Sequence, residues 1–371
     1  MTIYYLIFVF VCLTGFLFCL NSRQIVFATN ERCLYNAKKS QSSNLKILFA
    51  VYLIAIVLII GLRKHTVGAD TEAYIRDYYN VFLEKGTSRV ANFEIVLKAI
   101  GYLCSLVSKE YNFFLIICSF LTTALFFNFI LKNSKDPILS LVIFLGMFFI
   151  QSMNLMREWL AISFLVNAYT YYKEKKYKIS IIFMLLAFFT HITSVAFLII
   201  PFLFKIKNKK IMIFIVFAGC LLFYILRNTI LSSIVSLVPK FYVYIYGSDM
   251  VNESAFNFKD IVFLFILSAF LFFLFLKPKM FSVREKENLY EYSVFLIIAL
   301  TLSLVGQKYF MLHRIVYYFS VFLIISIPNF IKKMSFKNTI SLAVVIAMFY
   351  MLYRNAVVDN NQISNYLFFW Q

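Results

Sequence analysis

Long apolar runs separated by short charged stretches are the dominant pattern along the chain. Most of the runs are about 15–20 residues long. A transmembrane helix needs about 20 apolar residues, whereas a membrane β-strand shows only about ten residues of alternating polarity. The pattern therefore predicts membrane helices at roughly 3–20, 46–62, 94–107, 112–131, 137–155, 158–172, 179–204, 211–226, 260–276, 289–305, 315–331 and 339–353.

Two of these runs are irregular. The 94–107 run is short and begins with Glu94, and the 179–204 run is long and is expected to break at Thr190-His191. If neither run crosses fully, ten spans remain and the basic clusters of the short loops all lie inside. If both cross, there are twelve spans and six basic residues move outside. Both arrangements stay open.

Composition agrees with a membrane protein. Hydrophobic residues make up 62% of the chain and charged residues only 14%, which is more apolar surface than a soluble domain of this length can bury. We predict an all-α, polytopic integral membrane protein with about 10–12 transmembrane helices, including one or two re-entrant or broken segments. Residues 1–371 should form a single integral membrane domain, with no soluble domain.

The formal net charge of +19 indicates which side of the membrane each loop occupies. In a soluble protein this charge would suggest nucleic acid. Here Lys and Arg gather in short loops, as in cytoplasmic loops that contact anionic lipid. Loop 21–46 has five basic residues and is expected inside, which leaves 63–93, 227–259 and 307–314 outside. We expect membrane lipids, and no nucleic acid, among the partners.

Two ionisable residues at membrane depth are functional candidates, because such residues are expensive there. Arg157, in NLMREWL, has two interpretations. In the structural one its side chain snorkels to the membrane interface or pairs with Glu158. In the functional one its guanidinium binds a phosphate or diphosphate. His191 lies midway along the 179–204 run. It is either a core histidine or, at a helix break that lines a cavity, a base for a sugar hydroxyl.

A polar stretch in the first outer loop, GADTEAYIRDYY, is a third candidate. Asp70 suits a turn and could cap the helix that follows it. Alternatively Asp70 and Tyr74 face a sugar, because carboxylates and aromatic rings suit polyhydroxylated ligands. Arg76 would then be a nearby cation.

A fourth candidate is the basic group Lys308, His313 and Arg314, at the outer end of a helix. Basic residues outside the cell are not explained by the positive-inside bias. The group therefore fits either a phosphate-bearing ligand or ordinary contacts with lipid headgroups.

Several chemistries have no motif in the chain. There is no P-loop, G-x-S-x-G, H-E-x-x-H or Rossmann fingerprint, and the six cysteines include no C-x-x-C pair. ATP hydrolysis and zinc chemistry are disfavoured, and the lack of D-x-D at a membrane edge disfavours a metal-dependent glycosyltransferase. We expect neither a cofactor nor a metal.

The ordered set of motifs resembles the EpsG family, a branch of the Wzy-like polymerases of exopolysaccharide and capsule synthesis. The match is strongest in NLMREWL, KEKKYK, AFFTHITS and FLIIP, within 154–204. GADTEAY resembles the family's G-x-D-x-x-Y, NFEIVLKAIGYL has its early glutamate, and HRIVYYFSVFLIISIP resembles its late arginine–aromatic–proline helix. Two departures leave the flanking roles open: Glu158 stands where the family commonly has glutamine, and Thr193 where it often has serine.

The resemblance implies a polymerase of the glycosyltransferase type at the outer face of the bacterial plasma (inner) membrane. It would transfer a growing glycan (exopolysaccharide, capsule or O-antigen) from its polyprenyl diphosphate to a hydroxyl of the next lipid-linked oligosaccharide repeat unit. A flippase and a chain-length regulator are further candidate partners. The implied catalytic residues are His191, Arg157 and Asp70, and the implied diphosphate- or sugar-binding residues are Arg314, Lys308, Tyr74, Arg76, Glu94 and His313.

Two other functions stay open. A flippase or transporter of lipid-linked oligosaccharide would use the same outward cations without bond chemistry, although the chain has no internal repeat. A polysaccharide acyltransferase would need a histidine that meets an acyl donor, and His191 is compatible with that.

Overall fold

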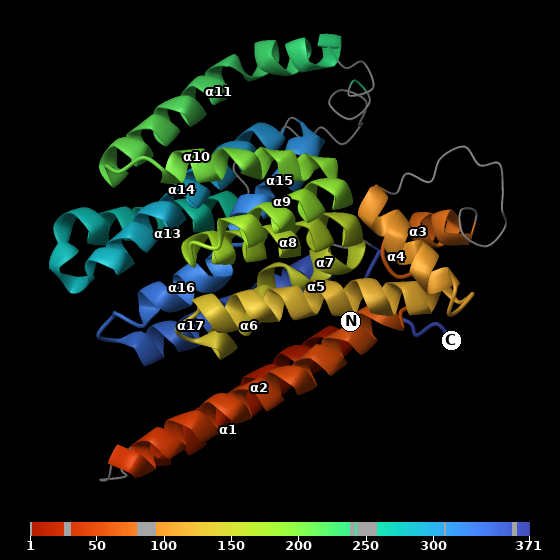
Figure 1. The fold of residues 1–371 in the computed structure, drawn as a ribbon, viewed down its shortest axis with the longest axis horizontal. Coiled ribbons are helices and arrows are strands. Elements are labelled where there is room, and N and C mark those ends of the chain that lie inside the picture. Colours follow the sequence, from red (N-terminus) through yellow and green to blue (C-terminus); the bar gives the residue numbers. More distant parts are fainter. Residues whose placement is uncertain are drawn as a thin grey trace. The chain divides into compact units, whose positions relative to one another are not determined.

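A computed structural model describes residues 2–25, 31–79, 94–237, 242, 258–307, 309–357 and 362–371 (Figure 1). Helices account for nearly all regular structure in these ranges, which contain no strand beyond the single bridge between Arg63 and Phe368. The chain divides into two compact units. Unit 1 is Met1–Ile192 with Ser335–Gln371, and unit 2 is Thr193–Met334.

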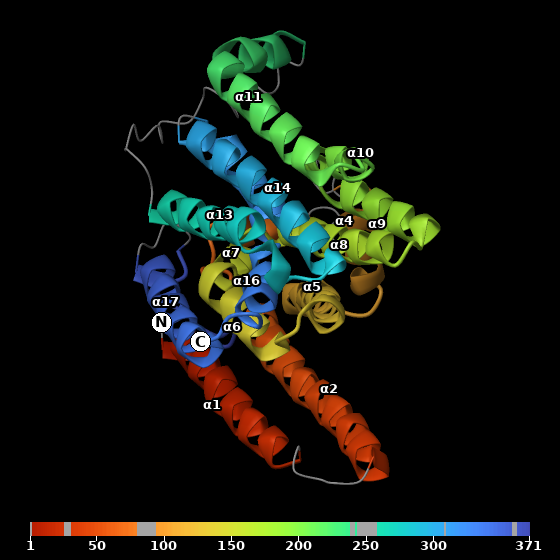
Figure 2. The same cartoon turned by 90° about the vertical axis from the view of Figure 1, so that its left-hand side faces the viewer.

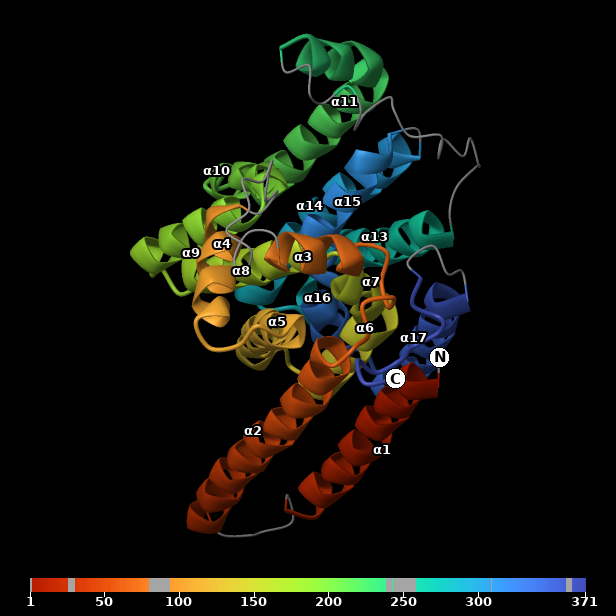
Figure 3. The same ribbon diagram turned by 90° about the vertical axis from the view of Figure 1, so that its right-hand side faces the viewer.

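Unit 1 contains all the predicted runs up to the helix that ends at Thr190. It also contains the last predicted run, 339–353. In Figure 2, α17 lies beside α1 and α6, and Figure 3 shows α4 beside α9. The helices are α1 (Thr2–Ile25), α2 (Glu31–Gly61), α3 (Thr71–Tyr78), α4 (Ile95–Ser105), α5 (Tyr111–Asn133), α6 (Pro137–Met147), α7 (Phe149–Asn154), α8 (Met156–Lys173), α9 (Tyr177–Thr190) and α17 (Lys337–Val357).

Unit 2 is built around α14, which packs against α11, α13 and α15. The 3-10 helix η2 (Ile192–Leu198) leads into the unit, and a second one, η4 (Pro278–Met280), precedes α14. Its α-helices are α10 (Ile199–Phe204), α11 (Lys209–Leu237), α13 (Phe258–Leu276), α14 (Val283–Gly306), α15 (Phe310–Ser320) and α16 (Leu323–Ile331).

The all-α membrane architecture is confirmed. Within the described residues, seven helices are long and apolar enough to cross a membrane, and five further apolar helices are shorter. Every predicted run carries helix. The protein is therefore a polytopic all-α membrane protein.

The predicted break in the 179–204 run is also confirmed. Helix α9 ends at Thr190, and His191 has extended backbone angles, φ −158° and ψ 120°. A 3-10 helix and the short α10 follow. The other irregular run forms α4, whose 11 residues reach only about 16 Å at 1.5 Å per residue. That is about half the hydrocarbon thickness of a bilayer, as expected for a partial span.

Two runs differ from the prediction. The 137–155 run is not one helix: it is interrupted at Phe148, whose ring centroid then lies 5.5 Å from that of Trp159. Conversely, the helix of the 211–226 run does not end at residue 226, because α11 continues through Leu237. Arg227 interrupts the apolar pattern without breaking the helix, because its guanidinium donates to the Tyr224 carbonyl and lies over the Tyr224 ring.

Aromatic side chains form the core of each unit. In unit 1 the fully buried Trp159 of α8 packs against Phe126, Phe144 and Phe148. In unit 2, Phe197 stacks on Phe295, Phe319 and Phe322. The two cores hold the elements on either side of His191 by close packing.

Gly146 allows α6 and α17 to approach closely within unit 1. A Cβ at this position would lie 2.6 Å from the Met348 carbonyl oxygen and 2.9 Å from the Met348 Cα. Backbone atoms cannot move aside cheaply, so we expect Gly146→Ala to destabilise the protein by about 1–3 kcal/mol. The measurement is the thermal unfolding midpoint in detergent.

Gly219→Ala in α11 is the matched control, because a Cβ there meets no atom within 4 Å. Its midpoint should stay unchanged or rise slightly, since alanine favours a helix over glycine by about 1 kcal/mol. Equal midpoints for the two variants would contradict the close approach at Gly146.

Candidate active site

His191 lies between two carboxylates in unit 1. Its Nδ1 is 2.8 Å from Glu94 Oε1, and its Nε2 is 3.3 Å from Glu158 Oε1. Glu94 stands at the N-cap position of α4, but its side chain makes no capping hydrogen bond and pairs with His191 instead. The helix break gives His191 the extended backbone from which its ring reaches both acids.

Arg157 joins this set through Glu94. Its Nη1 lies 3.6 Å from Glu94 Oε2, an ion-pair distance longer than a hydrogen bond. Its guanidinium carbon is 5.7 Å from the centre of the Tyr74 ring, which is a cation–π contact. Arg157 also lies in the first turn of α8, where the helix dipole favours an anion.

The four ionisable groups run from the interior of unit 1 towards its surface. The exposed fraction of the side chain is 6% for Glu158, 11% for His191, 24% for Glu94 and 25% for Arg157. A ligand that approaches from the surface therefore meets Arg157 and Glu94 first. We call Glu94, Arg157, Glu158 and His191 the charged cluster.

The charged cluster balances its charges. Both ring nitrogens of His191 face carboxylate oxygens, which suits an imidazolium: Nδ1 lies at hydrogen-bond distance from Glu94, and Nε2 lies at ion-pair distance from Glu158. With Arg157 also cationic, two positive groups offset the two carboxylates. This arrangement can bind an anion at its exposed end and accept or release a proton along the Glu94–His191 contact.

Tyr74 and Asp70 border the charged cluster from α3. Tyr74 is buried below Arg157, and burial raises the pKa of its hydroxyl, so it stays neutral. Asp70 occupies the N-cap position of α3, as predicted, but its side chain makes no capping hydrogen bond. Instead the Asp70 backbone N–H donates to Asn154 Oδ1 of α7 at 2.9 Å.

The C-terminal segment holds the loop that leads to Asp70. The backbone N–H of Lys64 donates to the Leu367 carbonyl at 2.9 Å, and that of Gly68 donates to the Gln362 carbonyl at 3.0 Å. Gly68 has φ +98°, a left-handed conformation that favours glycine. Residues 362–371 thus help to place α3 beside the charged cluster.

A match to a protein-family model identifies the family of this chain. The model of the EpsG family matches residues 46–368. The chain belongs to the EpsG family. The resemblance found in the sequence is thereby confirmed, and EpsG membership supports a polysaccharide polymerase-like role in a multi-pass membrane protein. Comparison with curated proteins and with solved structures found no match.

Four further candidates, Arg76, Arg314, Lys308 and His313, complete the predicted set. Arg76 is exposed and lies two residues after Tyr74 on α3, so the two point to different faces. Arg314 and the backbone of His313 belong to α15 of unit 2. Lys308 and the side chain of His313 lie outside the described residues.

Glu158 is the member of the charged cluster that the sequence did not reveal. Glu158 was considered only as a partner of Arg157, yet its carboxylate lies 3.3 Å from His191 Nε2. A signal was present, because Glu158 is a second ionisable residue at membrane depth directly after Arg157. The sequence did not show which side of α8 faces α9, and therefore did not show that Glu158 lies next to His191.

Proposed function

We propose that this EpsG protein polymerises lipid-linked oligosaccharide repeat units at the outer face of the bacterial plasma membrane. The donor is a glycan on polyprenyl diphosphate, and the acceptor is a sugar hydroxyl of the next lipid-linked unit. The observation that carries this proposal is the charged cluster, which combines a guanidinium with a carboxylate–imidazole pair at the surface of unit 1.

Arg157 has the chemistry to hold the leaving group. The acceptor oxygen bonds to the anomeric carbon of the donor while the bond from that carbon to the diphosphate oxygen breaks. Negative charge then grows on the polyprenyl diphosphate. A planar guanidinium offers several donors to two phosphate oxygens and stabilises that charge. Its 3.6 Å ion pair with Glu94 is loose enough for a phosphate oxygen to compete.

The Glu94–His191 pair has the chemistry to take the proton of the acceptor hydroxyl. Glu94 accepts that proton, because its carboxylate is the more exposed end of the pair. His191, as an imidazolium, holds Glu94 in place through Nδ1 and stabilises the charges. Glu158, nearly buried behind the ring, orients His191 and offsets its positive charge. Asp70 and Tyr74, from the start of α3, remain proposed contacts for a sugar of the substrate.

The other cations stay predictions. The charged cluster is neutral overall, so a diphosphate needs further positive charge. Arg314 and Lys308 are proposed for that role from the family resemblance, with His313 and Arg76 as further binding residues. A flippase that delivers the donor and a regulator of chain length complete the proposed partners.

One reconstitution distinguishes this function from the alternatives. The purified protein in liposomes receives a lipid-linked repeat unit, with no nucleotide added, and the products are separated by gel electrophoresis and weighed by mass spectrometry. We expect a ladder of glycans that grows by whole repeat units. Movement of the lipid across the bilayer without a ladder would indicate a flippase, and a mass gain of one acyl group would indicate an acyltransferase.

A further inference from the structure

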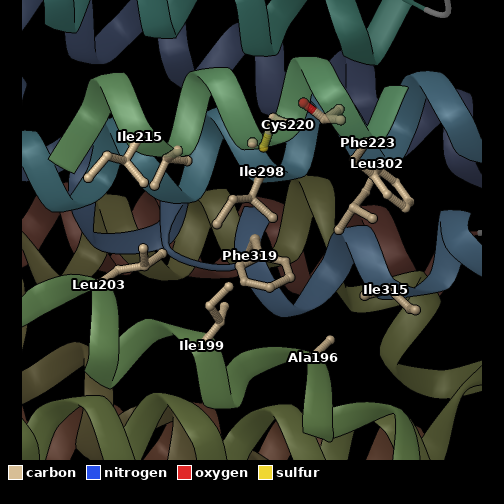
Figure 4. A pocket seen from close by; sticks show the side chains of 13 residues that line it. Ala196, Ile199, Leu203, Ile215, Cys220, Phe223, Ile298, Leu302, Ile315 and Phe319 are labelled. Carbon is tan, nitrogen blue, oxygen red and sulfur yellow. The ribbon is translucent and has the colours of Figure 1, made fainter. Parts of the chain in front are cut away.

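The two units bury different kinds of group away from the charged cluster. Unit 2 contains an apolar cavity of about 420 Å³, which Gly219 of α11 borders (Figure 4). Of the described residues that line this cavity, none carries a charge, so its walls do not select one apolar ligand over another. Unit 1 buries a charge instead, because the side chain of Arg63 is fully buried. A buried charge is costly and is therefore informative.

Arg63 lies just beyond the membrane span of α2 and forms no ion pair with an acid in the described part of the chain. Its Nη1 donates to the Ile60 carbonyl at 2.8 Å, and its Nε donates to Thr71 Oγ1 at 3.2 Å. Its Nη2 has no hydrogen-bond partner among the described residues. Burial lowers the pKa of Arg63 to about 10, so the guanidinium remains cationic at neutral pH. An apolar side chain would fill the same space at lower cost, so packing alone does not account for Arg63.

The Thr71 hydroxyl links Arg63 to the first turn of α3. Its hydrogen is donated to the Val67 carbonyl at 2.8 Å, and its oxygen accepts the hydrogen bond from Arg63. Gly68 leaves the space for this hydroxyl, because a Cβ at residue 68 would lie 2.6 Å from Thr71 Oγ1. Thr71 is itself fully buried. The Arg63 side chain therefore holds the start of α3 within a tightly packed turn.

The same face of α3 carries the contact with Arg157. Thr71, Tyr74 and Tyr78 are the buried residues of α3, and their spacing places them on one face of the helix. The Tyr74 ring lies 5.7 Å from the Arg157 guanidinium carbon, and the Tyr78 hydroxyl donates to the Ser108 carbonyl at 2.9 Å. Helix α3 has only eight residues, and a helix this short is not stable by itself. Its position therefore depends on these buried contacts.

We propose that Arg63 is a positioning residue, which holds α3 through Thr71 so that the Tyr74 ring stays against the Arg157 guanidinium. The inference rests on the proposed function, in which Arg157 holds the diphosphate leaving group. It adds how that guanidinium is kept in place. Arg63 does not touch the substrate, because its side chain is fully buried. It acts on the reaction through the position of α3.

The test breaks the contact between Arg63 and Thr71 from each side. Thr71→Val keeps the shape of the side chain but removes the acceptor, and Arg63→Lys keeps the charge but loses the fork of donors. Thr71→Ser keeps the hydroxyl, and Glu72→Gln changes an exposed residue of the same helix. We expect Thr71→Val and Arg63→Lys to lower kcat for polymerisation about tenfold or more, because the rate amplifies a small displacement. Thr71→Ser and Glu72→Gln should stay within about twofold of the wild type.

A double-mutant cycle separates positioning from a loss of structure. Tyr74→Leu already removes the contact of α3 with Arg157, so adding Thr71→Val should slow the reaction by less than about twofold further. If Thr71 were merely structural, its loss would lower the rate by the same factor with and without Tyr74. That result would overturn the proposal, and so would a Thr71→Ser variant as slow as Thr71→Val.

Hydrogen exchange gives a readout that needs no polymerisation. Mass spectrometry compares the exchange of backbone amides in α3 with that in α8, using the full chain purified in detergent. We expect Thr71→Val and Arg63→Lys to raise exchange in α3 several-fold and to leave α8 unchanged, whereas Thr71→Ser changes neither helix. Unchanged exchange in α3, or an equal rise in both helices, would contradict the positioning role. If the wild-type protein forms no polymer, the proposed function fails, while the exchange measurement still decides whether Arg63 holds α3.

Discussion

Replacing Arg157 by alanine should stop polymer growth while single-unit lipid intermediates accumulate. The guanidinium is the cation at the exposed end of the charged cluster, and Tyr74 and Glu94 fix its position. Loss of one preorganised group that stabilises developing negative charge lowers kcat by about 10²–10³-fold. The measurement is the initial rate of ladder formation in liposomes, together with chain length in cells.

Arg157→Lys and Lys178→Ala make this prediction specific. Lysine keeps the charge but loses the planar fork of donors, so Arg157→Lys should remain close to the alanine variant. Lys178 is an exposed cation at the start of α9 in the same unit, and its removal should leave the rate unchanged. Normal chain lengths in Arg157→Ala would refute the assignment of Arg157 to the diphosphate.

Glu94→Gln and His191→Gln should each lower kcat by about 10²–10⁴-fold, the usual contribution of general acid–base catalysis. The two side chains form one unit through the 2.8 Å contact between His191 Nδ1 and Glu94 Oε1. The double variant should therefore be no slower than the slower single variant, because residues that act together are not additive. KM for the donor should change little in the His191 variant, since Arg157 remains.

Thermal unfolding and a double-mutant cycle separate catalysis from structure. Glutamine keeps the shape of Glu94 and can replace a hydrogen bond of His191, so the midpoint of each variant should stay near that of the wild type. If His191→Gln retained most of the activity, the histidine would be structural. Additive losses in the Glu94 and His191 variants would show that the two groups act separately.

Part of the charged cluster follows from the sequence. Arg157 and His191 are identified because a charge or an imidazole inside an apolar run is costly and thus informative. Glu94 is assigned a binding role only through the family resemblance. The contact between Glu94 and His191 joins residues 97 positions apart, and no local pattern encodes it. It depends on α4 packing beside α9.

The helical membrane architecture and the break at His191 follow from the amino-acid sequence, because hydropathy and helix length are local properties of the chain. The family follows from the sequence as well, through motifs in a set order. The packed structure was needed to show that Glu158 faces His191, that α11 continues past Arg227, and that Gly219 borders a cavity. The physical reason is that these features depend on how each helix is rotated and which neighbours it meets, and uniformly apolar helices carry little periodicity to record it.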